Sequence, residues 1–371
     1  MKYIAIVLFL MLILALLAGA IIYVSSRCAI FFPSIPKKTW IYGFVGLFII
    51  TFLSMSVFAT TASPVGKAIF IFGGLIVSLF ILFLFSIVLT DIFNLVFKIS
   101  PFLRGFISIG LALLLTTYSI WNAYTIQVKK IEVPIKGLTQ EIRAVHLTDV
   151  HLGNFRGKGE VDKIVQKMKE LNPDVIFNTG DMFDSKTHFS EGKDVLSAFR
   201  TLNISHYFVY GNHDEQVGVE NVIKQMKESN ATVLLNEVAY LGELQIIGLN
   251  NMIPDQNSFD MHATADSETI ENTLKKLEIK ENHPTIVLHH RPDGVKYMQE
   301  KGADLLLAGH THARQIFPFI LIAKLMFGYN SGLYKYNTMD ILVSEGSGTI
   351  FTPIRLGTSS QIILIKLVPK I

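Results

Sequence analysis

The chain has 371 residues, 50% of them hydrophobic and 17% charged, with a formal net charge of +3 at pH 7 and one cysteine, Cys28, which excludes an intrachain disulfide. The charges are unevenly divided, because the first 127 residues hold seven Lys/Arg and a single acid, Asp91, which leaves 26 Lys/Arg and 29 Asp/Glu for the other 244. This second part therefore has a net charge of −3, and since it has no basic tract interleaved with aromatic residues, binding to nucleic acid is not expected.

Four apolar runs fill the first 127 residues, and each is long enough to cross a bilayer, which takes about 20 residues. They cover approximately Tyr3–Ser25, Ile41–Ala59, Ala68–Thr90 and Gly105–Ile126. The first run is too long for a signal peptide, lacks a small-residue cleavage site and is followed by three more runs. We therefore expect an integral, multi-pass membrane protein whose transmembrane domain, residues 1–127, is surrounded by a lipid bilayer.

The basic residues do not decide the orientation in the membrane. With four spans both chain ends lie on one side, together with Lys2, Lys67, Lys129, Lys130 and Lys136. The other side carries an equal number, namely Arg27, Lys37, Lys38, Lys98 and Arg104. Because no cleavable export signal is evident, we expect the second part of the chain to lie in the cytoplasm, held by a short tether over Gln127–Gly137.

Residues 128–371 alternate between strand-like and helix-like segments. Short apolar runs predict buried strands over Ile142–Leu147, Val175–Phe177, Tyr207–Val209, Ile286–Leu288 and Leu305–Leu307. Further strands are predicted over Thr232–Leu235, Val238–Leu241, Leu244–Leu249, Asp340–Ser344 and Gln361–Leu367. Amphipathic spacing predicts helices over Val161–Leu171 and Thr264–Leu277. This alternation predicts an α/β layer structure.

Polar blocks follow the first five of these strands, at the point where each apolar run ends. They are Asp149-Val150-His151, Gly180-Asp181, Gly211-Asn212-His213-Asp214, His289-His290 and Gly309-His310-Thr311-His312. Because loops at strand ends carry binding and catalytic residues, we expect these carboxylates, imidazoles and one amide to meet along one sheet edge. Such donors are typical of a metal site, and they suit Mn, Fe, Zn or Co.

The number of donors indicates two divalent ions. The seven candidate ligands are Asp149, His151, Asp181, Asn212, His290, His310 and His312. A single ion takes about four to six donors, whereas seven can hold two ions if one carboxylate bridges them. Two metals about 3.5–4 Å apart are the usual device for attack on phosphorus, because together they activate water and neutralise charge on oxygen. The blocks therefore predict phosphoester hydrolysis.

In this order the five blocks resemble the signature of the calcineurin-like metallophosphoesterase superfamily, which reads D-x-H, G-D, G-N-H-[DE], H and G-H-x-H. The resemblance spans Asp149 to His312 and extends to about Leu367. One block alone occurs often by chance, whereas the full ordered set is specific. The resemblance implies a four-layer α-β-β-α sandwich of two mixed sheets over residues 128–371, preceded by the four transmembrane helices.

The resemblance also implies a role for each residue. One ion would be held by Asp149, His151 and His312, and the other by Asn212, His290 and His310, with Asp181 bridging them. His213 would either protonate the leaving oxygen or stabilise the charge around phosphorus, and Asp214 would orient it. His290 is preferred to His289, because the following Arg291-Pro292-Asp293 matches the family's H-x-P-D stretch and strand alternation turns His289 to the other face.

Several other residues have more than one interpretation. Arg314 stands where many membrane-associated relatives have glycine, and it is either a bidentate contact for a substrate phosphate or a solvated loop residue. Asp184 either belongs to the site or caps the next segment. His146 is expected in the core or behind the ligands. No direct role is expected for His188, His206, His262 and His283.

Taken together, these features predict a membrane-anchored, binuclear-metal phosphohydrolase that cleaves a phosphodiester, pyrophosphate or phosphomonoester. Four spans are more than a hydrolase of soluble substrates needs, so a membrane lipid or lipid-linked substrate is expected. The bacterial branch that the chain resembles makes a UDP-2,3-diacylglucosamine-type pyrophosphate one candidate. The alternatives are a phosphoprotein phosphatase or nucleotide phosphodiesterase and, in another class, a non-catalytic membrane receptor. Lost ligands would favour the receptor, and none is lost.

Overall fold

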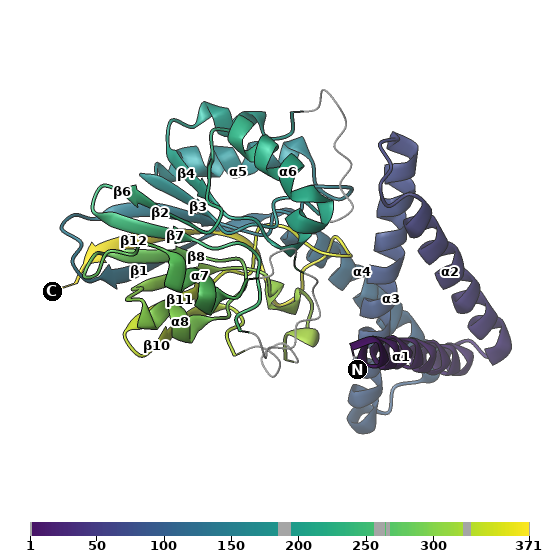
Figure 1. Ribbon diagram of the computed structural model, residues 1–371. Coiled ribbons are helices and arrows are strands. Elements are labelled where there is room, and N and C mark those ends of the chain that lie inside the picture. Colours follow the sequence, from purple (N-terminus) through teal and green to yellow (C-terminus); the bar gives the residue numbers. More distant parts are fainter. Residues whose placement is uncertain (1, 185–193, 256–263, 265–267, 322–327, 371) are drawn as a thin grey trace. The chain divides into compact units, whose positions relative to one another are not determined.

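The computed structural model describes residues 2–184, 194–255, 264, 268–321 and 328–370 (Figure 1). His188 and His262 lie outside the described residues, as does part of the helix expected over Thr264–Leu277. The chain divides into two compact units, Met1–Ile120 and Trp121–Ile371. This division falls before the boundary at residue 127 that the apolar runs suggested.

The first unit is helical. Its elements are α1 (Lys2–Phe31), α2 (Lys37–Val57), α3 (Pro64–Phe97) and α4 (Pro101–Tyr124), of which the last turn already belongs to the second unit. Each of these four helices contains a segment long and apolar enough to cross a membrane. Pro64 occupies the first position of α3, where its missing N–H would have no partner in any case, and the hydroxyl of Ser63 accepts the Gly66 N–H.

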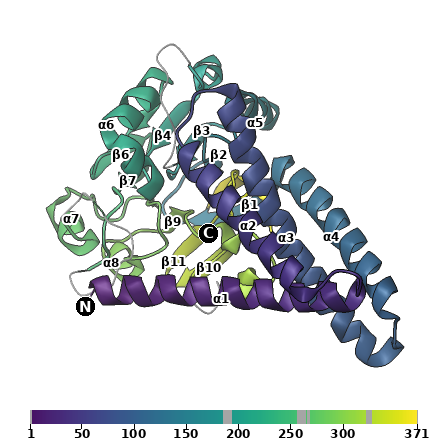
Figure 2. The same ribbon diagram turned by 90° about the vertical axis from the view of Figure 1, so that its right-hand side faces the viewer.

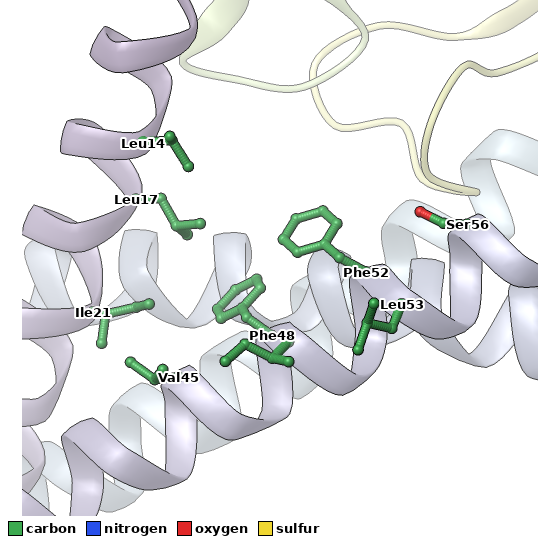
Figure 3. A pocket seen from close by; sticks show the side chains of 9 residues that line it. Leu14, Leu17, Ile21, Val45, Phe48, Phe52, Leu53 and Ser56 are labelled. Atoms are coloured by element: carbon green, nitrogen blue, oxygen red, sulfur yellow. The ribbon is translucent and has the colours of Figure 1, made fainter.

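Aromatic side chains pack these helices against one another. Phe48 of α2 meets Phe80 of α3 edge to face, with ring centroids 4.7 Å apart, and both residues are buried. The two helices lie side by side (Figure 2). A groove of about 450 Å³ runs between α1 and α2, lined almost entirely by apolar side chains such as Leu17 and Phe52 (Figure 3). Such a surface is compatible with lipid tails rather than water.

The second unit contains two mixed sheets of six strands each. The first sheet has the order β1 (Ile126–Ile135), β12 (Ser360–Pro369), β2 (Ile142–Leu147), β3 (Val175–Asn178), β4 (Ser205–Phe208) and β5 (Thr232–Val233). The second has the order β10 (Gly332–Tyr336), β11 (Met339–Val343), β9 (Leu305–Ala308), β8 (Thr285–Leu288), β7 (Leu244–Gly248) and β6 (Glu237–Leu241). Strands β2, β3 and β4 are parallel, as are β7, β8 and β9.

The sheets pack face to face and helices cover their outer faces. The inner core joins Phe177 of β3 to Ile286 of β8 and Leu305 of β9. Helices α5 (Lys158–Leu171) and α6 (Asn212–Glu228) cover the first sheet, and α7 (Ile270–Lys276) and α8 (Val295–Glu300) cover the second (Figure 1). These layers confirm the expected four-layer α-β-β-α sandwich of two mixed sheets.

The segment expected to be a tether is instead a strand. Over its whole length β1 pairs in parallel with β12, from Ile126 opposite Ser360 to Ile135 opposite Pro369. The expectation over Gln127–Gly137 was therefore wrong. In the sequence this segment, with its three lysines, resembles a polar linker. The strand that accepts its backbone hydrogen bonds is the last one in the chain, so no local pattern reveals the pairing.

The last turn of α4 is held by side chains and carbonyls of the second unit. Asn122 donates from Nδ2 to the carbonyls of Arg355 and Thr358, at 3.0 and 2.7 Å. The carbonyl of Ala123 accepts from the buried guanidinium of Arg156, at 2.6 Å, and from the hydroxyl of Ser360, at 2.5 Å. Helix carbonyls at a C-terminus normally lack intrahelical partners, so these contacts complete the helix end within the folded unit.

Candidate metal centre

The strand ends bring the seven predicted ligands to one edge of the two sheets. Asp149 and His151 follow β2, Asp181 follows β3, Asn212 begins α6 after β4, His290 follows β8, and His310 and His312 follow β9. Five of the seven have positive φ, between 48° and 69°: Asp149, His151, Asp181, His310 and His312. Residues other than glycine rarely adopt a positive φ, because this backbone conformation is strained. Such residues cluster at functional sites, where the surrounding fold holds them in place.

The glycines within the polar blocks make room for the carboxylates. A Cβ atom at Gly309 would collide with the carboxylate of Asp149, and one at Gly211 would collide with the carboxylate of Asp181. The pairing of glycine with an acid from a different block is therefore a steric requirement of the site.

Three buried side chains form one potential ion site. The Nε2 atoms of His151 and His312 lie 2.9 Å apart, and His312 Nε2 lies 3.2 Å from Asp149 Oδ1. Burial lowers the pKa of both imidazoles, that of His151 to about 3, so both rings are neutral near pH 7. Two neutral imidazoles and a carboxylate whose ligand atoms lie this close together are suited to binding a divalent cation.

A second potential site shares Asp149 and adds Asp181 and His290. His290 Nδ1 lies 2.8 Å from the carbonyl of Thr179, which can only accept, so Nδ1 carries the proton. His290 Nε2 is buried and makes no hydrogen bond among the described residues, although Asp181 Oδ2 lies 3.1 Å away. Because Nδ1 keeps its proton on Thr179, Nε2 is the ring nitrogen that can bind an ion, and it faces the Asp181 carboxylate that would share that ion.

The neighbouring His289 faces elsewhere. Its Nε2 lies 3.2 Å from Asp293 Oδ1, and it is in neither cluster. The alternation argument therefore chose the histidine that faces the acids. Asn212 and His310 complete the set, with Asn212 Oδ1 2.9 Å from His310 Nδ1 and the rings of His310 and His290 5.1 Å apart.

Facing imidazoles lower the pKa of both buried carboxylates. Burial raises the pKa of Asp149, but the facing imidazoles of His312 and His290 outweigh it and lower the pKa overall. The pKa of Asp181 is likewise lowered, against burial, chiefly by His290 and His213. In return Asp181 raises the pKa of His290 to about 9, against the effect of burial. Without metal the imidazolium therefore supplies the positive charge, and metal binding must release its proton.

His213, the predicted acid-base residue, lies close to a second carboxylate besides the adjacent Asp214. Both oxygens of Asp214 accept backbone N–H groups, from Gly211 and Phe183, each at 3.0 Å, so Asp214 caps α6. Asp184 Oδ1 instead lies 3.7 Å from His213 Nδ1. Orientation of His213 by Asp214 stays a prediction, and Asp184 is a second candidate for that role. Burial lowers the pKa of His213, but the nearby carboxylates of Asp181 and Asp184 have the larger, opposite effect. The pKa of His213 is therefore raised overall.

Arg355 is a site residue that sequence reasoning missed. Its fully buried guanidinium donates to the carbonyls of Glu345 and Gly348, at 2.6 and 2.7 Å, and Nη2 lies 3.3 Å from His312 Nδ1. Gly348 donates in turn to the carbonyl of Asp149, at 2.6 Å. In the sequence Arg355 lies in the loop-like stretch Pro353–Gly357, which contains no catalytic or metal-binding motif.

Two other expected residues occupy the positions that the sequence suggested. Arg314 is exposed at the end of the short 3₁₀ turn His312–Arg314, so its contact with substrate stays a prediction. His146 is buried behind the ligands, where its Nε2 lies 2.9 Å from the hydroxyl of Thr179, and burial lowers its pKa to about 3.

Comparison with known proteins agrees with this geometry. The family model "Calcineurin-like phosphoesterase" matches residues 142–314. An uncharacterised metallophosphoesterase of Helicobacter pylori is 32% identical over 285 residues, covering 72% of both chains. The chain belongs to the calcineurin-like metallophosphoesterase family. Its fold carries a binuclear divalent metal centre, and it is a metal-dependent phosphoesterase.

Two further relatives have names of their own. A "transmembrane protein with metallophosphoesterase domain" of Danio rerio is 29% identical over 265 residues, covering 67% of this chain and 59% of the relative. The "phosphodiesterase YaeI" of Escherichia coli is 25% identical over 241 residues, covering 61% and 82%. With the four apolar helices, the first of these relatives supports a membrane protein.

Proposed function

We propose that this phosphoesterase hydrolyses a phosphodiester, pyrophosphate or phosphomonoester of a lipid-linked substrate at the membrane surface. The observation that carries the proposal is the direct covalent continuity of a complete donor set with four apolar helices. Only Thr125 stands between the end of α4 and the start of β1, the edge strand of the catalytic unit. Such continuity confines the enzyme to the surface on which lipid headgroups are presented. A pyrophosphate of the UDP-2,3-diacylglucosamine type is one such substrate.

The seven donors fit two ions, as the unpartnered Nε2 of His290 and the convergence on Asp149 indicate. We assign Asp149, His151 and His312 to one ion and Asn212, His290 and His310 to the other, with Asp181 between them. Bound ions supply Lewis acidity towards phosphate oxygens and lower the pKa of water. His213 then donates its proton to the leaving oxygen, and Asp184 keeps the imidazole protonated beforehand.

A soluble substrate is the second candidate. The relative named a phosphodiesterase makes a nucleotide phosphodiester a candidate for this chain, and a phosphoprotein is the other soluble possibility. A receptor that only uses the fold for binding is disfavoured, because all seven donors are present: five lie in the two clusters described above, and the other two, Asn212 and His310, contact each other.

Activity profiling of the purified full-length protein tests the proposal. Lipid pyrophosphates and lipid phosphodiesters in mixed micelles are compared with cyclic nucleotides and phosphopeptides, each with Mn, Fe, Zn and Co varied. We expect the highest kcat/KM on a lipid substrate. Asp181→Asn, which removes the bridging charge, should abolish turnover and lower the metal content. A preference for a nucleotide or phosphopeptide would contradict the lipid assignment, and full turnover by Asp181→Asn would contradict the two-ion site.

The orientation of the chain in the membrane depends on the number of Lys and Arg residues on each side, and the presence of strand β1 changes this number. Lys129 and Lys130 lie in the folded strand, and Lys136 follows it directly, so none of them belongs to a membrane-flanking loop. The remaining basic residues are Lys2 and Lys67 on the side of the chain ends, against Arg27, Lys37, Lys38, Lys98 and Arg104. The positive-inside rule then favours the five on the cytoplasmic side.

We therefore propose that the catalytic unit lies outside the cytoplasm, in place of the cytoplasmic position expected from the lack of an export signal. Fusions to the C-terminus of the full-length chain test this in a bacterial host. Alkaline phosphatase, which folds only outside the cytoplasm, should be active there, and green fluorescent protein should be dark. The reverse pattern would restore the cytoplasmic assignment.

A further inference from the structure

A cluster of charges lies within the apolar helices of the first unit. Asp91 of α3 is paired with Arg27 of α1, Nε to Oδ2 at 2.7 Å, and with Arg104 of α4, Nη1 to Oδ1 at 3.0 Å. The hydroxyl of Tyr23 donates to the same carboxylate, at 2.6 Å. Two guanidinium groups thus share one carboxylate, and the cluster carries a net charge of +1.

This excess charge is largely withdrawn from water. Arg104 is only 8% exposed, and its guanidinium lies over the ring of Phe31, 5.5 Å from the centroid. Its Nε–H is buried and donates to no acceptor among the described residues. A buried, charged donor without an acceptor is unfavourable, because the desolvation of that group is not compensated. The cluster therefore lacks one negatively charged acceptor.

An apolar cavity of about 290 Å³ lies among the same four helices. Its lining includes Cys28, Phe32, Trp40, Phe83, Ile109 and Ala112. Cys28 directly follows Arg27 in α1, and Ile109 lies five residues after Arg104 in α4, about 7.5 Å along the helix. Phe32 connects the two features, because a Cβ atom at Gly105, the neighbour of Arg104, would lie 2.9 Å from its ring.

The cavity has a polar group of its own. The indole Nε1–H of Trp40 is buried and, among the described residues, has no hydrogen-bond partner. Trp40 stands near the start of α2, and its ring lies 6.3 Å from that of Phe32. Arg27, Asp91 and Arg104 also lie close to helix ends, α1 ending at Phe31, α3 at Phe97 and α4 beginning at Pro101. Tryptophan near a helix end is typical of the depth at which lipid headgroups meet acyl chains.

We propose that this site binds an anionic glycerophospholipid. Its phosphate accepts from Arg104 Nε and the guanidinium of Arg27, its ester carbonyl accepts from Trp40 Nε1, and one acyl chain fills the cavity. A lipid with a net charge of −1 neutralises the excess charge of the cluster, which a zwitterionic lipid does not. The site lies within the first unit and takes part in no step of the hydrolysis.

Fluorescence of Trp40 tests the proposal directly. The chain has two tryptophans, so in a Trp121→Phe background of the full-length protein Trp40 is the sole reporter. Brominated acyl chains quench tryptophan on contact, and vesicles of phosphatidylcholine containing brominated phosphatidylglycerol are compared with vesicles containing brominated phosphatidylcholine. We expect phosphatidylglycerol to associate about tenfold more strongly, the usual contribution of one charge-assisted hydrogen bond. Equal quenching by the two lipids would overturn the proposal.

Matched variants separate the site from general attraction to a charged surface. Arg104→Gln should bring the preference for phosphatidylglycerol close to one, whereas Lys38→Gln, which removes one exposed positive charge at the start of α2, should leave it within about twofold. Equal loss in both variants would mean nonspecific attraction. Should Arg104→Gln fail to fold, two milder changes replace it. Arg104→Lys keeps the charge but loses Nε, and Ala112→Leu partly fills the cavity; an unchanged preference in both would overturn the proposal.

A soluble competitor distinguishes a lipid from a free phosphate. Inorganic phosphate and glycerol phosphate have the same anionic group but no acyl chain, so neither should reverse the quenching by phosphatidylglycerol at millimolar concentration. Reversal by either anion would show that the cluster recognises phosphate alone, and the lipid assignment would be wrong.

Discussion

Under the proposed mechanism, the proximity of Asp184 sets the protonation state of His213, the imidazole assigned to the leaving group. Asp184 faces Nδ1 and helps to raise the pKa of His213, although burial alone would lower it. Asp184→Asn should therefore move the alkaline limb of kcat to lower pH on a substrate with a poor leaving group. A pH profile of kcat measures the shift. Asp214→Asn is the control: its carboxylate caps α6, so the limb should stay in place.

Removal of the imidazole itself has a graded effect. His213→Ala should retain both ions and lose about 10²–10⁴-fold in rate on a poor leaving group, the range for general acid catalysis. An activated aryl ester needs less protonation and should lose less. Equal losses on the two esters, or a loss of metal, would assign His213 to phosphate positioning or to the metal site.

His206 makes the catalytic unit sensitive to acid. It is buried beside Phe199, with ring centroids 5.4 Å apart, and burial lowers its pKa to about 4. The unfolded chain, with a histidine pKa of about 6.5, binds a proton that the folded chain excludes. This contribution to stability is therefore complete above pH 6.5 and falls as the pH drops towards 4, by up to about 3 kcal/mol.

Chemical unfolding of the protein between pH 7 and pH 4 measures this loss. His206→Phe keeps an aromatic ring against Phe199 and cannot titrate, so its stability should fall less over the same range. A parallel decline in both proteins would contradict the assignment to His206.

The sequence predicted which donors lie together better than it predicted the residues around them. Asp149, His151 and His312 come from separate blocks, yet each block ends a strand, and parallel strands bring such ends together. The proximity of Asp184 to His213 was not predicted, because the sequence points to the adjacent Asp214, whose carboxylate the hydrogen bonds of a helix N-terminus turn to the backbone. Arg355 could not be found, because burial and carbonyl partners are tertiary properties.

At the scale of elements, most strands were predicted from the sequence, whereas β1, β10 and the helices α6 and α8 were not. Strands with consecutive apolar residues, such as β8 and β9, carry their own signal, since both faces are buried. β1 is a polar edge strand, and its pairing with β12 joins opposite ends of the catalytic unit. A strand whose only partner is so distant in the sequence cannot be predicted from its own residues.

This pairing gives a prediction for shortened chains. A fragment that begins at Lys129 lacks the part of β1 that faces Ser360–Ile362, and it lacks the Ala123 carbonyl that accepts from Arg156. A buried guanidinium without its acceptor is destabilising, so this fragment should be less stable than one beginning at Trp121 by roughly 3 kcal/mol or more. Thermal unfolding of both fragments measures the difference. Equal stability would mean that the turn of α4 contributes nothing.

At the scale of the whole molecule, the apolar helices and the metal centre should act independently on a small substrate. The fragment beginning at Trp121 keeps all seven donors, so its kcat on a soluble aryl ester should equal that of the full-length protein. On a lipid phosphoester in vesicles, the reconstituted full-length protein should be faster, because anchoring raises the effective substrate concentration. Assays of both proteins on both substrates measure this, and equal rates in vesicles would favour a soluble substrate.

The junction between α4 and β1 also governs what can happen to the protein after synthesis. Many surface enzymes are shed when a protease cuts an exposed stalk. Here α4 ends at Tyr124 and β1 begins at Ile126, and the preceding turn is held through Asn122 and Ala123. No extended stalk separates the helix from the strand, so a protease must first unfold part of the catalytic unit. Release of a soluble catalytic unit by cleavage at this junction is therefore disfavoured, and an enzyme anchored in this way keeps its activity where its helices reside.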